Sequence, residues 1–203
     1  MRFPAEKLKA SGGHLYAHIH ENASTGLKRN LFWSLKLNFA PLKYCDSEFQ
    51  CGMMCEWIPW TARDWRDLDG EQLDVVFHVD GSVLSGPASV EASFYMTSHD
   101  QARRVSLKLR RGDGAKFTAS MSMIADFHGY DEDDADPNLP VAGEASVDYL
   151  GLIIVKGNLF PKPNAEAEAI AAAEQFIDVT KYGPPRDEDW RWVFPPEPSE
   201  SGE

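Results

Sequence analysis

Apolar and polar residues alternate with a period of two over much of the first forty positions of the chain. The clearest example is residues 31–39, in which every odd position is apolar and the even positions are mostly polar. Residues 14–20 alternate in the same way. Because side chains two residues apart project from the same face of a strand, both segments are predicted to be half-buried strands. The turn-forming residues 22–26 between them favour an antiparallel hairpin.

Strand patterns continue along the rest of the chain. They cover roughly residues 73–80, 88–97, 103–110, 115–128 and 145–156. Turn signals at Asp80-Gly81 and at residues 112–114 separate several of these strands. The last strand is apolar on both faces from Tyr149 onward, which predicts a central position in the sheet. Between residues 44 and 70 the alternation is lost, and we interpret this segment as an irregular connection.

A single α-helix is predicted near the C-terminus. Asn164 is a suitable N-cap, Glu166 lies in the positive first turn, and residues 183–185 (Gly-Pro-Pro) end the segment. We therefore expect an α+β fold: a mainly antiparallel β-sheet of five to seven strands, curved or sandwich-like, with one C-terminal helix. Residues 1–194 are expected to form a single β-rich domain, and residues 195–203 a flexible acidic tail that contains proline.

The charge of the chain narrows the choice of partners. The 203 residues, 43% of them hydrophobic, carry a formal net charge of -12. Residues 1–50 hold 7 basic and 4 acidic side chains, so the rest of the chain has a net charge of -15. Nucleic-acid binding requires Lys and Arg to neutralise phosphates, so this balance argues against a nucleic-acid partner. It favours a basic protein surface as the partner.

The N-terminal residues and the cysteines indicate the compartment. Residues 1–7 lack the apolar core of a secretory signal, and no apolar run approaches the ~20 residues that span a bilayer. We therefore expect a cytoplasmic protein without a membrane partner. The three cysteines, Cys45, Cys51 and Cys55, are odd in number and are not spaced as a disulfide framework or as a standard zinc site. They are expected to be reduced thiols.

The segment His18-Ile19-His20 is the strongest indication of a metal site. Two imidazoles at this spacing project from the same face of a strand, where both can reach one divalent transition metal such as Zn²⁺. His14 lies on the same predicted face. A further ligand, either a carboxylate or another histidine, would have to come from elsewhere in the fold. The alternative is a polar strand face that happens to carry histidines.

Carboxylates are concentrated in one predicted loop. They are Asp131, Glu132, Asp133, Asp134 and Asp136. The loop lacks the ligand spacing of an EF-hand, which argues against a calcium site of that type. It could instead mimic phosphate and occupy a basic groove of a partner protein. The alternative is a solvated connection, since blocks of like charge are often only solvent-facing.

These patterns favour a binding protein over an enzyme. The chain contains no nucleotide-binding loop, nucleophile elbow or zinc-protease helix, and residues 98–100 (Ser-His-Asp) are sequence neighbours that rarely converge as a triad. We expect a non-catalytic acidic module of the inhibitor or immunity-protein type, which neutralises a cationic partner through the acidic loop. The alternative is a metal-dependent enzyme or a small-ligand-binding β-barrel that uses His18 and His20. The sequence assigns no catalytic residue, no other cofactor and no oligomeric state.

Overall fold

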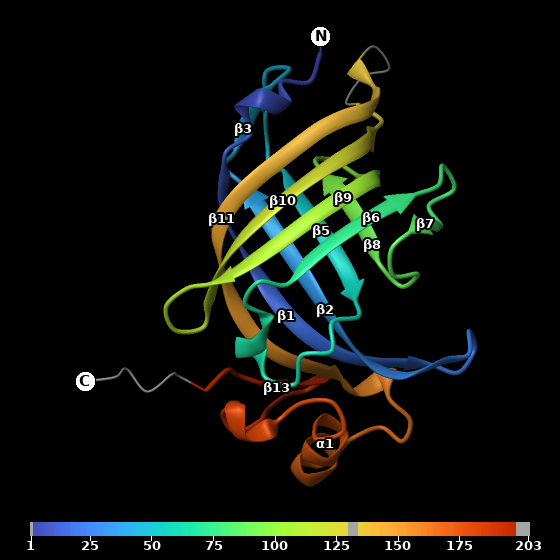
Figure 1. Cartoon of the computed structure of the whole chain (residues 1–203), viewed down its shortest axis with the longest axis vertical. Coiled ribbons are helices and arrows are strands. Elements are labelled where there is room, and N and C mark those ends of the chain that lie inside the picture. Colours follow the sequence, from blue (N-terminus) through green and yellow to red (C-terminus); the bar gives the residue numbers. More distant parts are fainter. Residues whose placement is uncertain (1, 130–133, 198–203) are drawn as a thin grey trace.

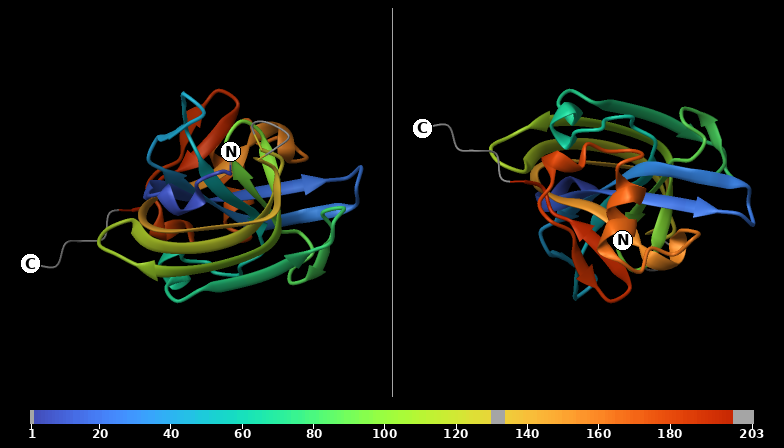
Figure 2. Two further views of the ribbon diagram at one scale, coloured as in Figure 1. Left: turned by 90° about the horizontal axis from the view of Figure 1, so that it is seen from above. Right: turned by 90° about the horizontal axis from the view of Figure 1, so that it is seen from below.

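A large sheet that closes on itself forms most of the molecule. The computed structural model describes residues 2–129 and 134–197. Within them the main sheet has 11 strands, and Figures 1 and 2 show the strands wrapped around a common axis. These strands are β1 (Ala10–Asn22), β2 (Leu27–Phe39), β5 (Gly52–Ile58), β6 (Gln72–Phe77), β7 (Val83–Ser85), β8 (Glu91–Tyr95), β9 (His99–Arg111), β10 (Lys116–Phe127), β11 (Asp136–Val155), β12 (Arg186–Glu188) and β13 (Arg191–Phe194).

The ring closes because β10 pairs with both β9 and β11. Hydrogen-bonded neighbours follow the order β11, β1, β2, β5, β8, β9, β10 and back to β11. Among the described strands, β1 and β11 pair in parallel and all other neighbours are antiparallel. β13 extends the sheet along β11, and β6 pairs with the second half of β9. The predicted hairpin of residues 14–39 and the central position of β11 are both confirmed.

The prediction of a mainly antiparallel α+β fold is confirmed, but its strand count is too low. The segment between residues 44 and 70, interpreted as irregular, contains the central strand β5. The separate hairpin of β3 (Leu42–Tyr44) and β4 (Ser47–Phe49) precedes that strand. Alternation is hidden in β5 because the strand is only seven residues long and contains a bulge. Further strands of three or four residues were too short for a periodic pattern to reveal.

Aromatic side chains fill the interior of the ring. Trp33 of β2 and Trp65 of the short 3-10 helix Trp65–Leu68 are both 0% exposed. The ring of Trp65 stacks on Tyr149 of β11 at a centroid distance of 5.4 Å. At the other end, Phe3 packs against Phe127 at 4.7 Å. Burial of this many aromatic side chains supplies the main stabilising term of the fold, because each removes a large apolar area from water.

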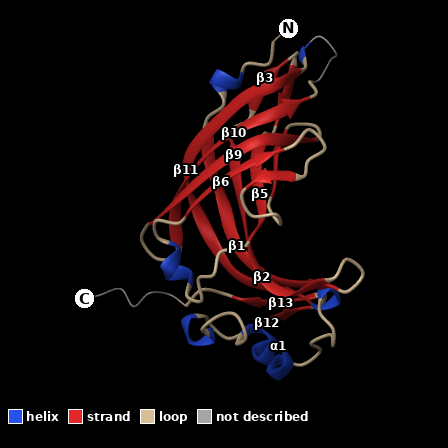
Figure 3. Ribbon diagram, turned by 45° about the vertical axis from the view of Figure 1, so that its right-hand side comes forward, coloured by secondary structure: helices blue, strands red, loops and turns tan. Residues whose placement is uncertain are grey.

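The C-terminal helix lies at one end of the ring, beside β13 (Figures 1 and 3). This helix, α1, spans Glu166–Ala173. It ends about ten residues before residues 183–185, where the sequence predicted its end. Its N-cap is Ala165 instead of Asn164, because the Glu168 carboxylate accepts the backbone N–H groups of both residues. The remainder of the predicted helix contains only turns and a short 3-10 helix, Val179–Lys181.

The start of the predicted tail is held to the domain by backbone hydrogen bonds. Pro195 accepts the N–H of Gly183, and Glu197 donates its N–H to Lys181. The rest of the predicted tail, residues 198–203, lies outside the described residues. No helix in the described parts of the chain combines the length and the apolar character needed to cross a membrane.

Candidate functional site

A bulge in β5 turns two consecutive side chains, those of Glu56 and Trp57, toward the outside of the ring. In the register with β2, one extra residue of β5 is accommodated between Cys55 and Ile58, which are both fully buried in the core. The backbone φ of Trp57 is +57°, a conformation that costs energy for a bulky side chain. Bulges re-aim side chains and are frequent beside functional sites. Glu56 and Trp57 are therefore the first residues to consider for function.

The Trp57 indole packs against the histidine face of β1. It meets the imidazoles of His18 and His20 edge-on, at centroid distances of 4.8 and 5.0 Å. It also contacts Phe32 of β2 at 5.4 Å, so that this outward-facing phenyl ring is only 2% exposed. The predicted alternation of β1 is correct, and the histidines lie on the outer surface of the ring, opposite the core.

Burial keeps the imidazoles of this face in their neutral form. Burial, with a smaller contribution from the neighbouring His20, lowers the pKa of His18 to about 4. Burial also lowers the pKa of His20 and of His14. The Nδ1 atoms of His18 and His20 are enclosed and have no hydrogen-bond partner in the described structure. Buried polar atoms without a partner are rare in native proteins, so these two nitrogens require an explanation.

Together with β11 and the C-terminal segment, the histidine face and the bulge enclose a cavity of about 360 Å³. We call this cavity the outer pocket. It is lined by His14, Tyr16, His18, Ile19, Glu56, Trp57, Leu150, Ile153, Val155, Asn158, Trp190 and Arg191. Trp190 is 58% exposed and Leu150 is 43% exposed. A volume of this size, with mostly apolar walls and a few polar groups, is typical of sites for small organic molecules.

The polar groups of the outer pocket include one carboxylate and one guanidinium. The Tyr16 hydroxyl donates to Glu56 Oε1 at 3.4 Å. Burial raises the pKa of Glu56, and the nearby charge of Glu91 raises it as well. Arg191 donates from Nε to the Glu188 carboxylate at 2.8 Å, and its guanidinium lies 4.7 Å from the centroid of the Trp190 ring. The positive charge of Arg191 is thus already paired, whereas Glu56 forms no ion pair within the described residues.

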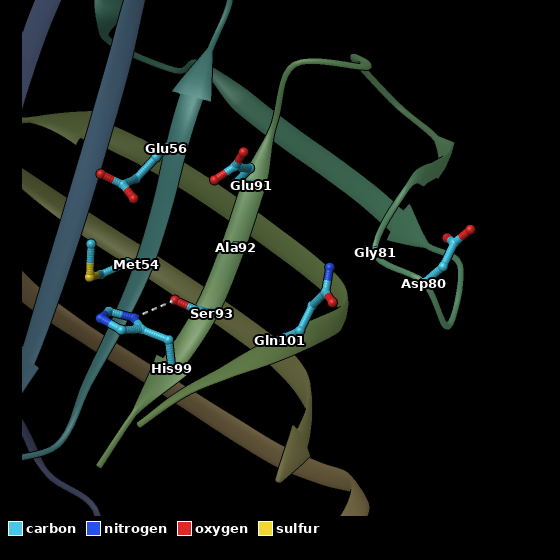
Figure 4. A pocket seen from close by; sticks show the side chains of 9 residues that line it. All are labelled: Met54, Glu56, Asp80, Gly81, Glu91, Ala92, Ser93, His99 and Gln101. Atoms are coloured by element: carbon cyan, nitrogen blue, oxygen red, sulfur yellow. Dashed lines mark hydrogen bonds between the residues drawn. The ribbon is translucent and has the colours of Figure 1, made fainter. Parts of the chain in front are cut away.

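Glu56 also lines a second cavity of about 450 Å³, which we call the acidic groove (Figure 4). It is lined by Met54, Glu56, Asp80, Gly81, Glu91, Ala92, Ser93, His99 and Gln101. Glu56 and Glu91 are register partners on β5 and β8. His99 Nδ1 lies 3.2 Å from Ser93 Oγ. Because Glu56 belongs to both cavities, the outer pocket and the acidic groove are neighbouring parts of one outer face.

The predicted metal site lacks further ligands in the described structure. His18 and His20 lie on the same face, as expected, but no group of three or more His, Cys, Asp or Glu side chains within residues 2–129 and 134–197 is arranged to hold a metal ion. Two imidazoles alone are fewer ligands than a zinc site requires. Metal binding by His18 and His20 therefore stays a prediction.

The acidic loop is only partly described, and its described members have partners within the chain. Asp131, Glu132 and Asp133 lie outside the described residues. Asp134 is 4% exposed and accepts a hydrogen bond from the Tyr44 hydroxyl. Asp136 is the first residue of β11 and pairs with Arg2 at 3.4 Å. The expectation that all five carboxylates face a partner is therefore wrong for Asp134, because its carboxylate is buried.

The remaining chemical candidates from the sequence do not converge on one place. Ser98, His99 and Asp100 form no triad, since His99 contacts Ser93 whereas Asp100 is buried and accepts from His128 at 2.7 Å. The three cysteines are unpaired. Burial raises the pKa of Cys51 to about 11 and that of Cys55 to about 12. These two thiols are packing residues of the core, and their chemistry is suppressed.

Comparisons of the chain with protein-family models, with curated proteins and with solved structures found no match. The geometry of the outer face therefore carries the functional argument. Sequence reasoning identified His14, His18 and His20, and Trp57 as one of several tryptophans that could line an apolar groove, but it missed Glu56 and the bulge that turns both residues outward. The signal for these two was the interruption of the period-two pattern between Cys55 and Ile58, where two polar or amphipathic residues separate two core residues.

Proposed function

We propose that the protein binds a small organic molecule in the outer pocket. The observation that carries this proposal is the bulge at Glu56 and Trp57. The bulge holds Trp57 at a positive φ of +57°. As a result, the Trp57 indole lies on the outer surface of the sheet and not in the hydrophobic core inside the ring. Strain of this kind persists where surrounding structure enforces it and is concentrated at functional sites.

The lining of the outer pocket supports this proposal. Outer faces of closed sheets are normally polar and solvated, but here Trp57, Phe32, Leu150 and Ile153 form an apolar surface beside neutral imidazoles. The interior of the ring is filled by side chains such as Trp33 and Trp65. The small-ligand alternative from the sequence is therefore retained, with the site on the outside of the ring instead of its interior.

The test is a screen of small ring-containing compounds by thermal shift, followed by NMR titration of the hits. We expect at least one saturable binder that raises the unfolding temperature of the wild type. Trp57→Ala and Trp190→Ala are each expected to weaken the affinity for this binder about tenfold or more, because each removes a large apolar contact. Because Trp190 is 58% exposed, its replacement should leave the fold intact, so a loss of binding in this variant reports on the pocket.

The matched control is Leu84→Ala, which removes an exposed apolar side chain from β7, outside the outer pocket. Binding should be unchanged in this variant. A screen without a saturable binder, or a binder that is unaffected by both tryptophan substitutions, would overturn the proposal.

A further inference from the structure

Two glutamates face each other across neighbouring strands, and within the described residues neither is paired with a Lys or an Arg. Glu56 of β5 and Glu91 of β8 are direct register partners, and Figure 4 shows both carboxylates on the same side of the sheet. Like charges at directly opposed positions destabilise a sheet. Within the described parts of the chain, no Lys or Arg lies within ion-pairing distance of either carboxylate. The His99 imidazole, which lines the same groove, lowers the pKa of Glu56 through its charge, but the pair has no permanently charged partner within the described residues.

The wall beside this pair is suited to a cation that carries an apolar body. Glu56 lines both the acidic groove and the outer pocket, and the Tyr16 hydroxyl lies 3.4 Å from its carboxylate. Trp57 and Tyr16 provide aromatic rings, which attract cations through their π-faces. Burial lowers the pKa of His14, His18 and His20, and Arg191 is paired with Glu188, so the lining of the outer pocket offers little repulsion to a positive ligand.

We propose that the ligand of the outer pocket is a small organic cation, whose ammonium group lies between Glu56 and Glu91 and whose apolar body packs on Trp57. This inference rests on the proposed function and adds the charge of the ligand. A primary ammonium has three N–H donors and can satisfy both carboxylates at once. The carboxylate pair gives selectivity for charge, and the aromatic wall gives contact area.

The experiment compares three probes of similar size and different charge. They are 2-phenylethylammonium, the neutral 2-phenylethanol and the anionic 3-phenylpropanoate, each titrated by NMR into the full chain at pH 7.5. We expect the ammonium to bind at least about tenfold more tightly than the alcohol, in line with the strength of hydrogen bonds to charged groups. The carboxylate probe is expected to bind most weakly.

Substitution of single glutamates then assigns the preference to the proposed pair. Glu56→Gln and Glu91→Gln each remove one negative charge and keep nearly the same shape. Each substitution is expected to weaken binding of the ammonium probe about tenfold and to change the affinity for the alcohol by less than about twofold. The matched control is Glu166→Gln, which makes the same change of net charge at an exposed position on α1. It should leave all three probes unaffected.

The outcomes separate this inference from the proposed function. If the alcohol binds as tightly as the ammonium and Trp57→Ala weakens both, the outer pocket binds a ligand but the assignment of a cation is wrong. If Glu166→Gln weakens the ammonium as much as Glu56→Gln, the preference arises from net charge alone and the inference is also wrong. If none of the three probes binds and the compound screen yields no binder, the proposed function fails together with the inference.

Discussion

Acid should destabilise this protein through His18, and the size of the effect follows from its surroundings. The imidazole is enclosed by Trp57 and Phe32, with centroid distances of 4.8 and 5.9 Å, and its pKa is lowered from 6.5 to about 4. The unfolded chain therefore binds a proton at His18 between pH 6.5 and 4, whereas the folded chain does not. Stability from this group is complete above pH 6.5 and is lost as the pH falls toward 4.

The perturbation that isolates this effect is His18→Phe, which keeps an aromatic ring between Trp57 and Phe32 but cannot take up a proton. From pH 7.5 to pH 5.0, the free energy of unfolding should fall by about 2 kcal/mol more in the wild type than in His18→Phe, since each pKa unit corresponds to about 1.4 kcal/mol. The raised pKa of Glu56 acts in the opposite direction but is common to both proteins.

The assay is urea unfolding at the two pH values, monitored by tryptophan fluorescence. The linear extrapolation gives the free energy of unfolding of each protein at each pH. Equal losses in the wild type and in His18→Phe would refute the argument, because they would mean that the His18 imidazole is accessible to protons in the folded state. A histidine resonance that titrates near pH 6.5 in the wild type and is missing from the variant would lead to the same conclusion.

Three further outcomes are expected. Trp65→Ala should lower the free energy of unfolding by about 3–5 kcal/mol in urea titrations, because it removes a fully buried indole that stacks on the core; a loss below about 1 kcal/mol would contradict the packed interior. Tyr44→Phe should cost about 1–3 kcal/mol by the same assay, since it removes a hydroxyl that donates to the buried Asp134 carboxylate, and unchanged stability would show that this bond contributes nothing. Titration with Zn²⁺ followed by histidine NMR should show only weak binding, because His18 and His20 have no third described ligand; a one-to-one complex that is lost in His18→Ala would restore the metal hypothesis.

Most of the long strands could be predicted because their pattern reflects one simple constraint. A strand with one face in the core must alternate, and β1 and β2 are long enough for the alternation to be clear. The face of β1 that carries His14, His18 and His20 could be predicted for the same reason. Which side of the closed sheet this face occupies could not, since either side satisfies the alternation.

The bulge in β5 was missed because it interrupts the alternation on which the strand prediction rests. Between Cys55 and Ile58 two residues occupy the place of one, so that Glu56 and Trp57 both point outward. In the sequence this resembles an irregular segment. The partners of Asp134 and Asp136 were hidden for a different reason. Tyr44 is 90 residues from Asp134 along the chain, and Arg2 is 134 residues from Asp136. Only the folded structure brings each pair together.

The net charge of the chain acquires a more specific meaning once the outer face is known. The sequence predicted a cationic partner from a net charge of -15 beyond residue 50 and assigned the contact to the acidic loop. Within the described residues, Glu56 and Glu91 form no ion pair with Lys or Arg, and Glu56 also lines the outer pocket, whereas Asp134 is buried against Tyr44. A negative surface concentrates small cations near it at low ionic strength, but this attraction is screened beyond about 10 Å at 0.1 M salt. Long-range attraction alone would therefore give weak and unselective binding. The selectivity that we infer must come from the contact between the ammonium group and the two opposed carboxylates, and it should persist at physiological salt.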